Sequence, residues 1–275
     1  MHGYAAFTDT GDDITGSNWS QVANLDRPVM FITPFLPKVI FGNFVTFDEI
    51  VLFSYGIDTK MKAFLTKITK RISFYTETNQ GSHMKGVFLK KGEECWIIHT
   101  TANMTTGCIE CCYNIYFRKK INVEPWGELM NTYARYYQDS NDSSMYIIKE
   151  EDSFFVCGRN VVPFILNNSE NVICATNYTA MSFIRRYRER IKRVYFSNTT
   201  DITKVWESGE WVVPAIEHRV TNHIKMYRGM NYCAFGSANA STQSMANAEV
   251  LYITNNRHIY NKVLEFEKLL SSMIY

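Results

Sequence analysis

The sequence predicts an α/β protein built from two similar lobes, each a mixed β-sheet flanked by helices. In both halves of the chain a β-branched strand, a basic helical stretch and a second strand precede a His-x-Lys triplet. Each triplet then leads through an apolar run to an asparagine, from His83 to Asn103 and from His223 to Asn239. An internal repeat supports a fold more strongly than either copy alone. We therefore expect a pseudo-twofold axis that brings the two histidines into one site.

The boundary between the lobes is predicted in the polar segment 138–144, QDSNDSS, which has the composition of a linker. A predicted helix over residues 124–137 precedes this segment, with Pro125 in its first turn. The chain of 275 residues thus divides into an N-terminal lobe, residues 1–143, and a C-terminal lobe, residues 144–275, both of ordinary domain size.

The N-terminal lobe starts with residues 1–25, which show no clear period and predict an irregular lead-in or a short edge strand. Residues 28–47 are β-branched and aromatic. They are interrupted by Pro34, Pro37 and Gly42, which predicts short strands separated by turns.

Two basic helices are predicted at matching places in the repeat. In residues 58–71 apolar side chains recur at helical spacing, and Asp58 or Thr59 is available as the N-cap. Its lysines lie mostly off the apolar face, which favours a solvated outer surface. The second helix, predicted over residues 182–193, concentrates a charge of +5 between residues 185 and 193 in a protein of net charge +2. There a nucleic-acid contact and a solvated surface are equally favoured.

The remaining elements of the C-terminal lobe follow from shorter patterns. Strands are predicted over residues 145–149, 153–158 and 250–254, and a helix with apolar residues on one side over residues 260–273.

The second His-x-Lys triplet begins a recognisable motif. In a strand alternate side chains share a face, so His223 and Lys225 point to one side, as do Ser237 and Asn239 after the turn. With Gly236 this segment resembles the motif H-x-K-(x)4-D-(x)6-G-S-x-N of the phospholipase D superfamily. It departs from that pattern at Met230, which occupies the Asp position, and in having sixteen residues from His to Asn where the pattern has seventeen.

The first copy of the motif is weaker. It keeps His83, Lys85 and Asn103 but has Thr101 in place of the motif serine. Thr100 stands in place of the motif glycine and Lys90 in place of the Asp.

The resemblance implies a phosphodiesterase whose two motifs form one site. The phosphodiester would be held by Lys85, Lys225, Asn103 and Asn239, which also stabilise the charge of the transition state. The resemblance makes His83 the nucleophile and His223 the general acid, with a phosphohistidine intermediate that activated water releases. Because lysine and asparagine supply what a metal would otherwise provide, we expect no metal and no cofactor.

Each imidazole also needs a partner that fixes its tautomer. Glu249 is the family-like candidate in the second half, whereas Tyr113 occupies the comparable position ten residues after Asn103. The incomplete set of acids keeps open the possibility of a catalytically degenerate binding protein on the same fold.

The sequence is compatible with three classes of function. The favoured one is a nuclease or DNA phosphodiesterase; the others are a phospholipase or phosphatidyltransferase, and a non-enzymatic binder. The nucleic acid, DNA rather than RNA, would contact the basic stretch of the second lobe. Its residues are Arg185, Arg186, Arg188, Arg190, Lys192 and Arg193.

Localisation and cysteine chemistry are predicted from composition. The chain has no run of eighteen apolar residues and no signal-peptide pattern, and it carries seven cysteines, an odd number. Sequons at Asn103 and Asn239 would place glycans inside the site of a secreted protein. These observations predict a cytoplasmic monomer without stable membrane association. The CIECC segment, residues 108–112, and the other cysteines are interpreted as core packing and not as a metal site.

Overall fold

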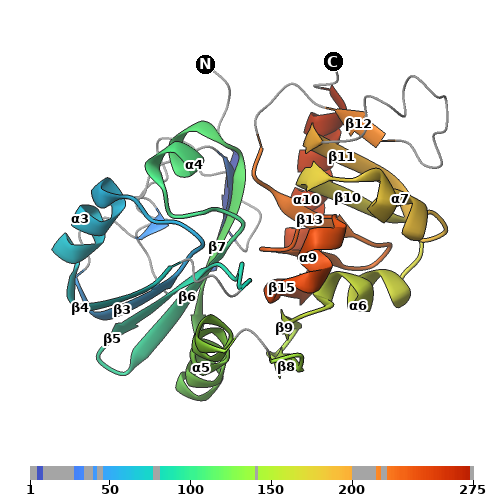
Figure 1. Cartoon of the computed structure of the whole chain (residues 1–275). Coiled ribbons are helices and arrows are strands. Elements are labelled where there is room, and N and C mark those ends of the chain that lie inside the picture. The colour runs from blue at the N-terminus through green and yellow to red at the C-terminus, as the bar shows by residue number, and fades with distance from the viewer. Residues whose placement is uncertain are drawn as a thin grey trace.

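The computed structural model describes residues 5–8, 28–33, 40–41, 46–76, 81–139, 142–199, 215–217 and 222–272. Most of the expected lead-in, and the expected turns at Pro34, Pro37 and Gly42, lie outside these residues. Two mixed β-sheets stand side by side, one from each half of the chain (Figure 1). The predicted fold class is confirmed.

The first sheet has seven strands in the order β1-β2-β7-β6-β5-β3-β4. Its strands are β1 (Ala5–Thr8), β2 (Val29–Thr33), β3 (Phe47–Phe53), β4 (Thr69–Tyr75), β5 (Gly86–Lys91), β6 (Glu94–Thr100) and β7 (Asn114–Ile121). Only the β3–β4 pair is parallel among these described strands.

The second sheet has eight strands in the order β12-β11-β10-β13-β14-β15-β9-β8. Its strands are β8 (Met145–Lys149), β9 (Ser153–Gly158), β10 (Val172–Thr179), β11 (Ile191–Thr199), β12 (Ala215–Glu217), β13 (Lys225–Arg228), β14 (Cys233–Gly236) and β15 (Glu249–Thr254). The β10–β11 and β11–β12 pairs are parallel.

The two sheets repeat one topology. The order β7-β6-β5-β3-β4 in the first sheet matches β15-β14-β13-β10-β11 in the second, including the one parallel pair at the end of each series. The internal repeat read from the sequence is therefore present in the fold. The described strands of the first sheet end at Ile121 and those of the second begin at Met145, so the lobe boundary at residue 143 stays a prediction within that interval.

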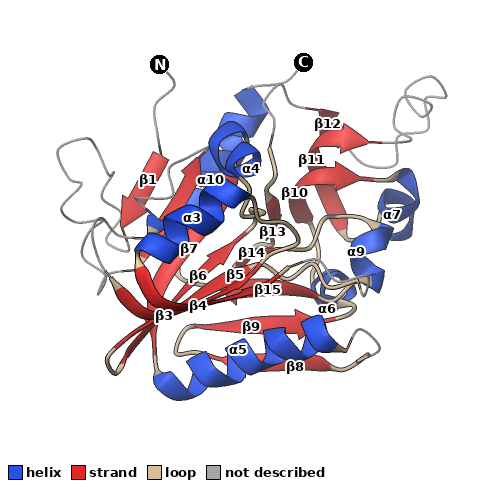
Figure 2. Ribbon diagram, turned by 60° about the vertical axis from the view of Figure 1, so that its left-hand side comes forward, coloured by secondary structure: helices blue, strands red, loops and turns tan. Residues whose placement is uncertain are grey.

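The helices fall into three groups, one on the outer face of each sheet and one between the sheets. They are α3 (Thr59–Lys67), α4 (Thr106–Cys111), α5 (Val123–Gln138), α6 (Val161–Asn167), α7 (Met181–Arg186), α9 (Thr242–Ala246) and α10 (Arg257–Ser272). Apolar residues of α3 and α4 pack on the outer face of the first sheet (Figure 2), and those of α6, α7 and α9 on the second. The long helices α5 and α10 contribute to the core between the sheets.

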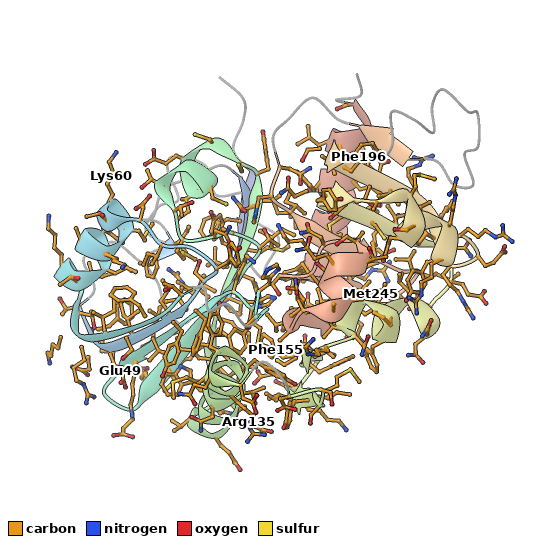
Figure 3. The ribbon with its side chains drawn as sticks, viewed as in Figure 1. Glu49, Lys60, Arg135, Phe155, Phe196 and Met245 are labelled. Carbon is orange, nitrogen blue, oxygen red and sulfur yellow. The ribbon has the colours of Figure 1, made fainter. Side chains whose placement is uncertain are left out.

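The central core contains large aromatic residues from both halves. Phe155 of β9 lies between the lobes (Figure 3) and its ring centroid is 5.0 Å from that of Tyr252. Phe117 of the first sheet is also 5.0 Å from Tyr252. Since apolar burial contributes roughly 25 cal/mol per Å², this shared core stabilises the packing of the two sheets against one another.

Both basic helices are shorter than predicted. Asp58 caps α3 as expected, accepting a bond from Met61 N, but the helix ends at Lys67 and the rest of the stretch belongs to β4. The helix predicted over residues 182–193 ends at Arg186, and β11 starts at Ile191. Parallel pairing with β10 outweighs helix propensity there, because it buries Val194 and Phe196.

Candidate active site

Each His-x-Lys triplet starts from a backbone contact with the opposite lobe. Ser82 forms a parallel bridge with Ala248, and His83 N donates to Ala248 O at 2.8 Å. On the other side Asn222 bridges Tyr113, and His223 N donates to Tyr113 O at 2.8 Å. This symmetric exchange brings the two triplets to one place between the sheets.

The two motif lysines are buried in the same environment. Lys85 and Lys225 are 3% and 1% exposed, and each ammonium donates to the carbonyl of its own histidine, at 2.8 Å and 2.6 Å. Burial lowers the pKa of both lysines. The charge of Lys85 lowers the pKa of Lys225 further, while Glu249 opposes the shift in both. The site thus holds two desolvated lysines whose charged forms repel one another.

His83 is oriented by residues of both lobes. Its Nδ1 lies 3.4 Å from Glu249 Oε1 and 2.9 Å from Asn247 Nδ2, and its ring meets the edge of Tyr55 with centroids 4.9 Å apart. Asn247 Nδ2 can only donate, so its contact with Nδ1 and the contact of Nδ1 with Glu249 belong to different tautomers of the ring. In the tautomer with a proton on Nδ1, Glu249 accepts that proton, and Nε2, which lies 3.5 Å from Asn247 Nδ2, is the nitrogen left to react.

The pairing of Glu249 corrects the sequence interpretation. Glu249 was expected to serve the histidine of its own half, but its carboxylate faces His83. The reason is the crossed bridge, which places the start of β15 beside the first triplet.

The carboxylate of Glu249 is fixed and ionised. It is fully buried, and Ser237 Oγ donates to its Oε2 while accepting from Val250 N at 2.9 Å. Burial alone would raise the pKa of Glu249, but His83, Lys85 and Ser237 outweigh that effect and lower it. Ser237, predicted as a site residue, therefore acts on the carboxylate.

The first-half counterpart of Glu249 is Asn114, which the sequence interpretation missed. Thr101 N donates to Ile115 O as Ser237 N does to Val250 O, so Asn114 occupies the place of Glu249. Asn114 Oδ1 lies 3.4 Å from Thr101 Oγ1. The segment from Asn103 to Asn114, which carries α4, is one residue longer than the segment from Asn239 to Glu249, so counting ten residues from the motif asparagine pointed to Tyr113.

His223 has a carbonyl where His83 has a carboxylate. Its Nδ1 lies 2.8 Å from Thr101 O and 2.9 Å from Lys225 Nζ. A carbonyl only accepts and an ammonium only donates, so the two contacts call for different tautomers of the ring. In the tautomer that donates from Nδ1 to Thr101 O, Nε2 is the nitrogen left to react. Burial, followed by the charge of Lys225, lowers the pKa of His223.

The motif asparagines complete the arrangement. Both are half-buried; Asn239 Oδ1 accepts from Thr176 Oγ1 at 3.1 Å, and Asn103 Oδ1 has no hydrogen-bond partner among the described residues. At Gly236 a Cβ would meet Val250 O at 2.1 Å, which explains why the motif needs glycine there. The first half accommodates Thr100 at the equivalent place, with its hydroxyl accepting from Ala102 N.

The positions of the missing motif acids lie away from these side chains. Lys90 is on β5 near the far end of its hairpin, and Met230 is 74% exposed in the turn between β13 and β14. An aspartate at either place would not contact the imidazoles in this fold.

The predicted nucleic-acid residues do not form one helix face. Arg185 and Arg186 end α7, and Arg188 and Arg190 lie in the following turn. The remaining two residues, Lys192 and Arg193, belong to β11. Most of these side chains are exposed, and α7 itself starts where β10 ends beside Asn239. The basic stretch therefore runs outward from the site.

The cysteines divide into two groups. Four are buried in strands, as predicted: Cys95, Cys157, Cys174 and Cys233. The interpretation of residues 108–112 as core packing holds only in part, since Cys108 packs against the core of the first lobe but Cys111 on α4 is exposed and Cys112 is half-buried. Within the described ranges no group of three or more His, Cys, Asp or Glu side chains is placed to hold a metal ion.

No helix of the described chain has the length and apolar character needed to cross a membrane.

Comparison with known proteins supports the fold. No family model and no curated protein sequence matches this chain. A yeast tyrosyl-DNA phosphodiesterase structure aligns with a TM-score of 0.53 at 12% identity, over 92% of this chain and 89% of that one. Phosphatidylserine synthase from Haemophilus influenzae Rd KW20 aligns with a TM-score of 0.51 at 9% identity, over 99% of this chain and 89% of that one.

A polyphosphate kinase from Porphyromonas gingivalis is also similar, with a TM-score of 0.50 at 9% identity, over 80% of this chain and 42% of that one. These proteins belong to the superfamily that the motifs resemble, and the resemblance to phospholipase D proteins is confirmed at the level of the fold. The chain has the two-lobed phospholipase D fold.

Proposed function

We propose that this protein is a phosphodiesterase that cleaves nucleic acid through a phosphohistidine intermediate at the site shared by its two lobes. The observation that carries this proposal is the crossed arrangement of the motifs, in which His83 of one lobe is oriented by Glu249 of the other beside two buried lysines. Such a site is complete only when both lobes are present.

The phosphodiester binds to the two ammonium groups and the motif amides. Lys85 and Lys225 are buried and each donates to the carbonyl of its own histidine, which leaves N–H groups of the ammonium for an anion. An anion also stabilises their charged forms against the desolvation that lowers their pKa values. The same donors stabilise the extra negative charge of the five-coordinate transition state.

The chemical steps use the two imidazoles in turn. Nε2 of His83 attacks phosphorus while Nδ1–H donates to Glu249, which stabilises the positive charge that develops on the ring. His223 protonates the oxygen that leaves. It then takes a proton from water, which attacks the phosphohistidine and frees His83.

Nucleic acid is favoured as the substrate by charge. The basic stretch of α7, its turn and β11 leads away from Asn239 and offers contacts to phosphates outside the site. A DNA phosphodiesterase is among the similar folds.

A second candidate is phosphatidyl transfer at the same site. It is favoured by the similarity of nearly the whole chain to a phosphatidylserine synthase. The neutral Asn114, which stands in the place of Glu249, favours a third outcome, a binding protein that has lost turnover.

The proposal is tested with the purified full chain and labelled single-stranded DNA, duplex DNA, RNA and phosphatidylcholine, each with and without excess chelator. We expect cleavage of nucleic acid that survives the chelator and is abolished in His83→Ala. His258→Ala, which changes an exposed histidine on α10, is the matched control and should cleave as the parent does. Cleavage of phosphatidylcholine alone would identify the second candidate. Equal cleavage by His83→Ala would place the activity elsewhere.

A further inference from the structure

An exposed aromatic ring lies beside the proposed nucleophile. Tyr55 follows β3, and its ring centroid is 4.9 Å from that of His83, at an interplanar angle of 79°. Among the aromatic side chains that the structure describes, Tyr55 is the most exposed, at 38%. The His83 side chain is itself 24% exposed, so both rings can be reached from solvent. An exposed aromatic ring at a reacting centre offers a flat surface to a substrate.

The backbone that carries Tyr55 is fixed by the fully buried Ser54. The Ser54 hydroxyl donates to Gly56 O at 2.6 Å, which closes the chain around Tyr55. It also accepts from Met104 N at 2.9 Å, and Met104 directly follows the motif residue Asn103. The ring is therefore placed relative to the site before a substrate arrives. A ligand that stacks on it immobilises little more than one side chain, which keeps the entropic cost of binding small.

The second lobe has no aromatic ring at the matching place. The Thr176 hydroxyl repeats both contacts of Ser54: it donates to the carbonyl two residues on, at 2.9 Å, and accepts, at 3.1 Å, from the backbone N–H after the motif asparagine. The strand registers agree, since the residue after each motif lysine pairs with the residue before this hydroxyl. Asn177 therefore occupies the place of Tyr55. The aromatic surface belongs to the His83 side of the site alone.

We propose that Tyr55 is a stacking platform for the base of the nucleotide that stays on His83, so that the substrate carries an unpaired base next to the cleaved phosphodiester. In an in-line displacement the leaving oxygen departs on the side opposite the attacking nitrogen. Groups beside His83 thus face the part of the substrate that the phosphohistidine retains. This inference rests on the proposed phosphodiesterase function and specifies its substrate.

Stacking on a single ring selects for unpaired nucleotides. Every base has a π face, so an aromatic side chain binds bases with little sequence preference. A base inside a duplex is already stacked between its neighbours, and extruding it costs free energy that an unpaired end does not lose. Single strands and unpaired ends are therefore favoured over the interior of a duplex.

The first test measures turnover of short single-stranded DNA with a p-nitrophenyl phosphodiester on its 5′-terminal nucleotide, which carries either adenine or no base. For the parent we expect KM to be about 5- to 150-fold lower with adenine, at similar kcat, the range for one base–aromatic stack. Tyr55→Ala should lose this preference and Tyr55→Phe should keep it. Met230→Ala, at an exposed apolar residue away from the site, is the control and should match the parent.

Three results of this test would overturn the stacking role. One is a preference for adenine that persists in Tyr55→Ala. Another is a Tyr55→Ala defect of equal size on both substrates, because the ring would then only position His83. The third uses p-nitrophenyl phosphorylcholine, since an aromatic face also binds quaternary ammonium groups. A Tyr55→Ala defect confined to that substrate would assign the ring to a choline headgroup.

A binding assay separates this inference from the proposed activity. The probe is the reaction product, a 5′-phosphorylated single strand whose terminal base is 2-aminopurine, which loses fluorescence when it stacks on an aromatic ring. We expect quenching with the parent and with Tyr55→Phe, much less with Tyr55→Ala, and little when the same base is paired in a blunt duplex. If the parent shows this pattern but no turnover, the proposed function fails and the stacking site stands. Equal quenching by Tyr55→Ala and the parent would overturn the stacking site, whatever the activity.

Discussion

At the scale of single residues, the two histidines of this site are not equivalent. His83 faces a buried carboxylate, whereas His223 faces the carbonyl of Thr101. A carboxylate stabilises an imidazolium and a carbonyl does so less, which suits His83 to bear the charge of a phosphohistidine. This asymmetry, which the sequence motifs do not contain, supports the assignment of His83 as the nucleophile.

The role of Glu249 gives a direct prediction. Glu249→Gln keeps the shape of the side chain but removes the acceptor charge facing His83, so kcat should fall by about 10- to 100-fold with KM little changed. Steady-state kinetics on labelled DNA measure this. His83→Ala should cost far more, because it removes the reacting atom. Parent-like kcat in Glu249→Gln would show that the crossed contact does not contribute to turnover.

At the scale of secondary structure elements, the sequence predicted the order of strands and helices and the hairpins that carry the motifs. The helix α5 and the strands β8 and β9 fall where they were expected. The partner of each imidazole was not predictable, because the crossed bridges at Ser82 and Asn222 are tertiary contacts. The end of α7 was missed for a similar reason, since pairing with β10 decides where β11 begins.

The basic stretch around α7 gives a prediction at this scale. Arg186→Gln with Arg188→Gln removes two exposed charges that lie away from the imidazoles. Binding of single-stranded DNA should weaken, and the slope of log K against log salt should fall by roughly 1.4. The rate at saturating substrate should not change.

The matched control for this variant is Lys60→Gln with Lys62→Gln on α3, the corresponding helix of the first lobe, where Lys60 points outward (Figure 3). This pair removes the same charge from the protein and should leave the salt slope close to that of the parent. Equal effects of the two variants would mean that net charge, and not the α7 surface, governs binding.

At the scale of the whole molecule, the two lobes are held together by buried contacts that depend on pH. His99 of β6 is fully buried, its Nε2 lies 2.8 Å from Phe235 O on β14, and its ring packs 5.5 Å from that of Phe155. Burial lowers the pKa of His99 to about 4. The folded protein therefore keeps this imidazole neutral where the unfolded chain would protonate it.

This shift predicts acid sensitivity. Below pH 6.5 the unfolded chain binds a proton at His99 that the folded protein refuses until about pH 4, so the free energy of unfolding should fall as the pH drops through this window. The loss from this group is on the order of 3 kcal/mol. Denaturant unfolding of His99→Gln should show a shallower dependence on pH than the parent, with exposed His258→Gln as the control. Identical slopes in all three proteins would contradict the assignment.

The claim that both lobes build one phosphodiesterase site is tested most directly by trapping the covalent intermediate. His223→Ala keeps the nucleophile but lacks the group that activates water, so a DNA end carrying a 5′-³²P-phosphodiester with a p-nitrophenyl leaving group should label the protein. We predict an acid-labile, base-stable label that maps to His83 and is absent from the double variant that adds His83→Ala. A label on any other residue, or none while p-nitrophenol is released, would contradict it.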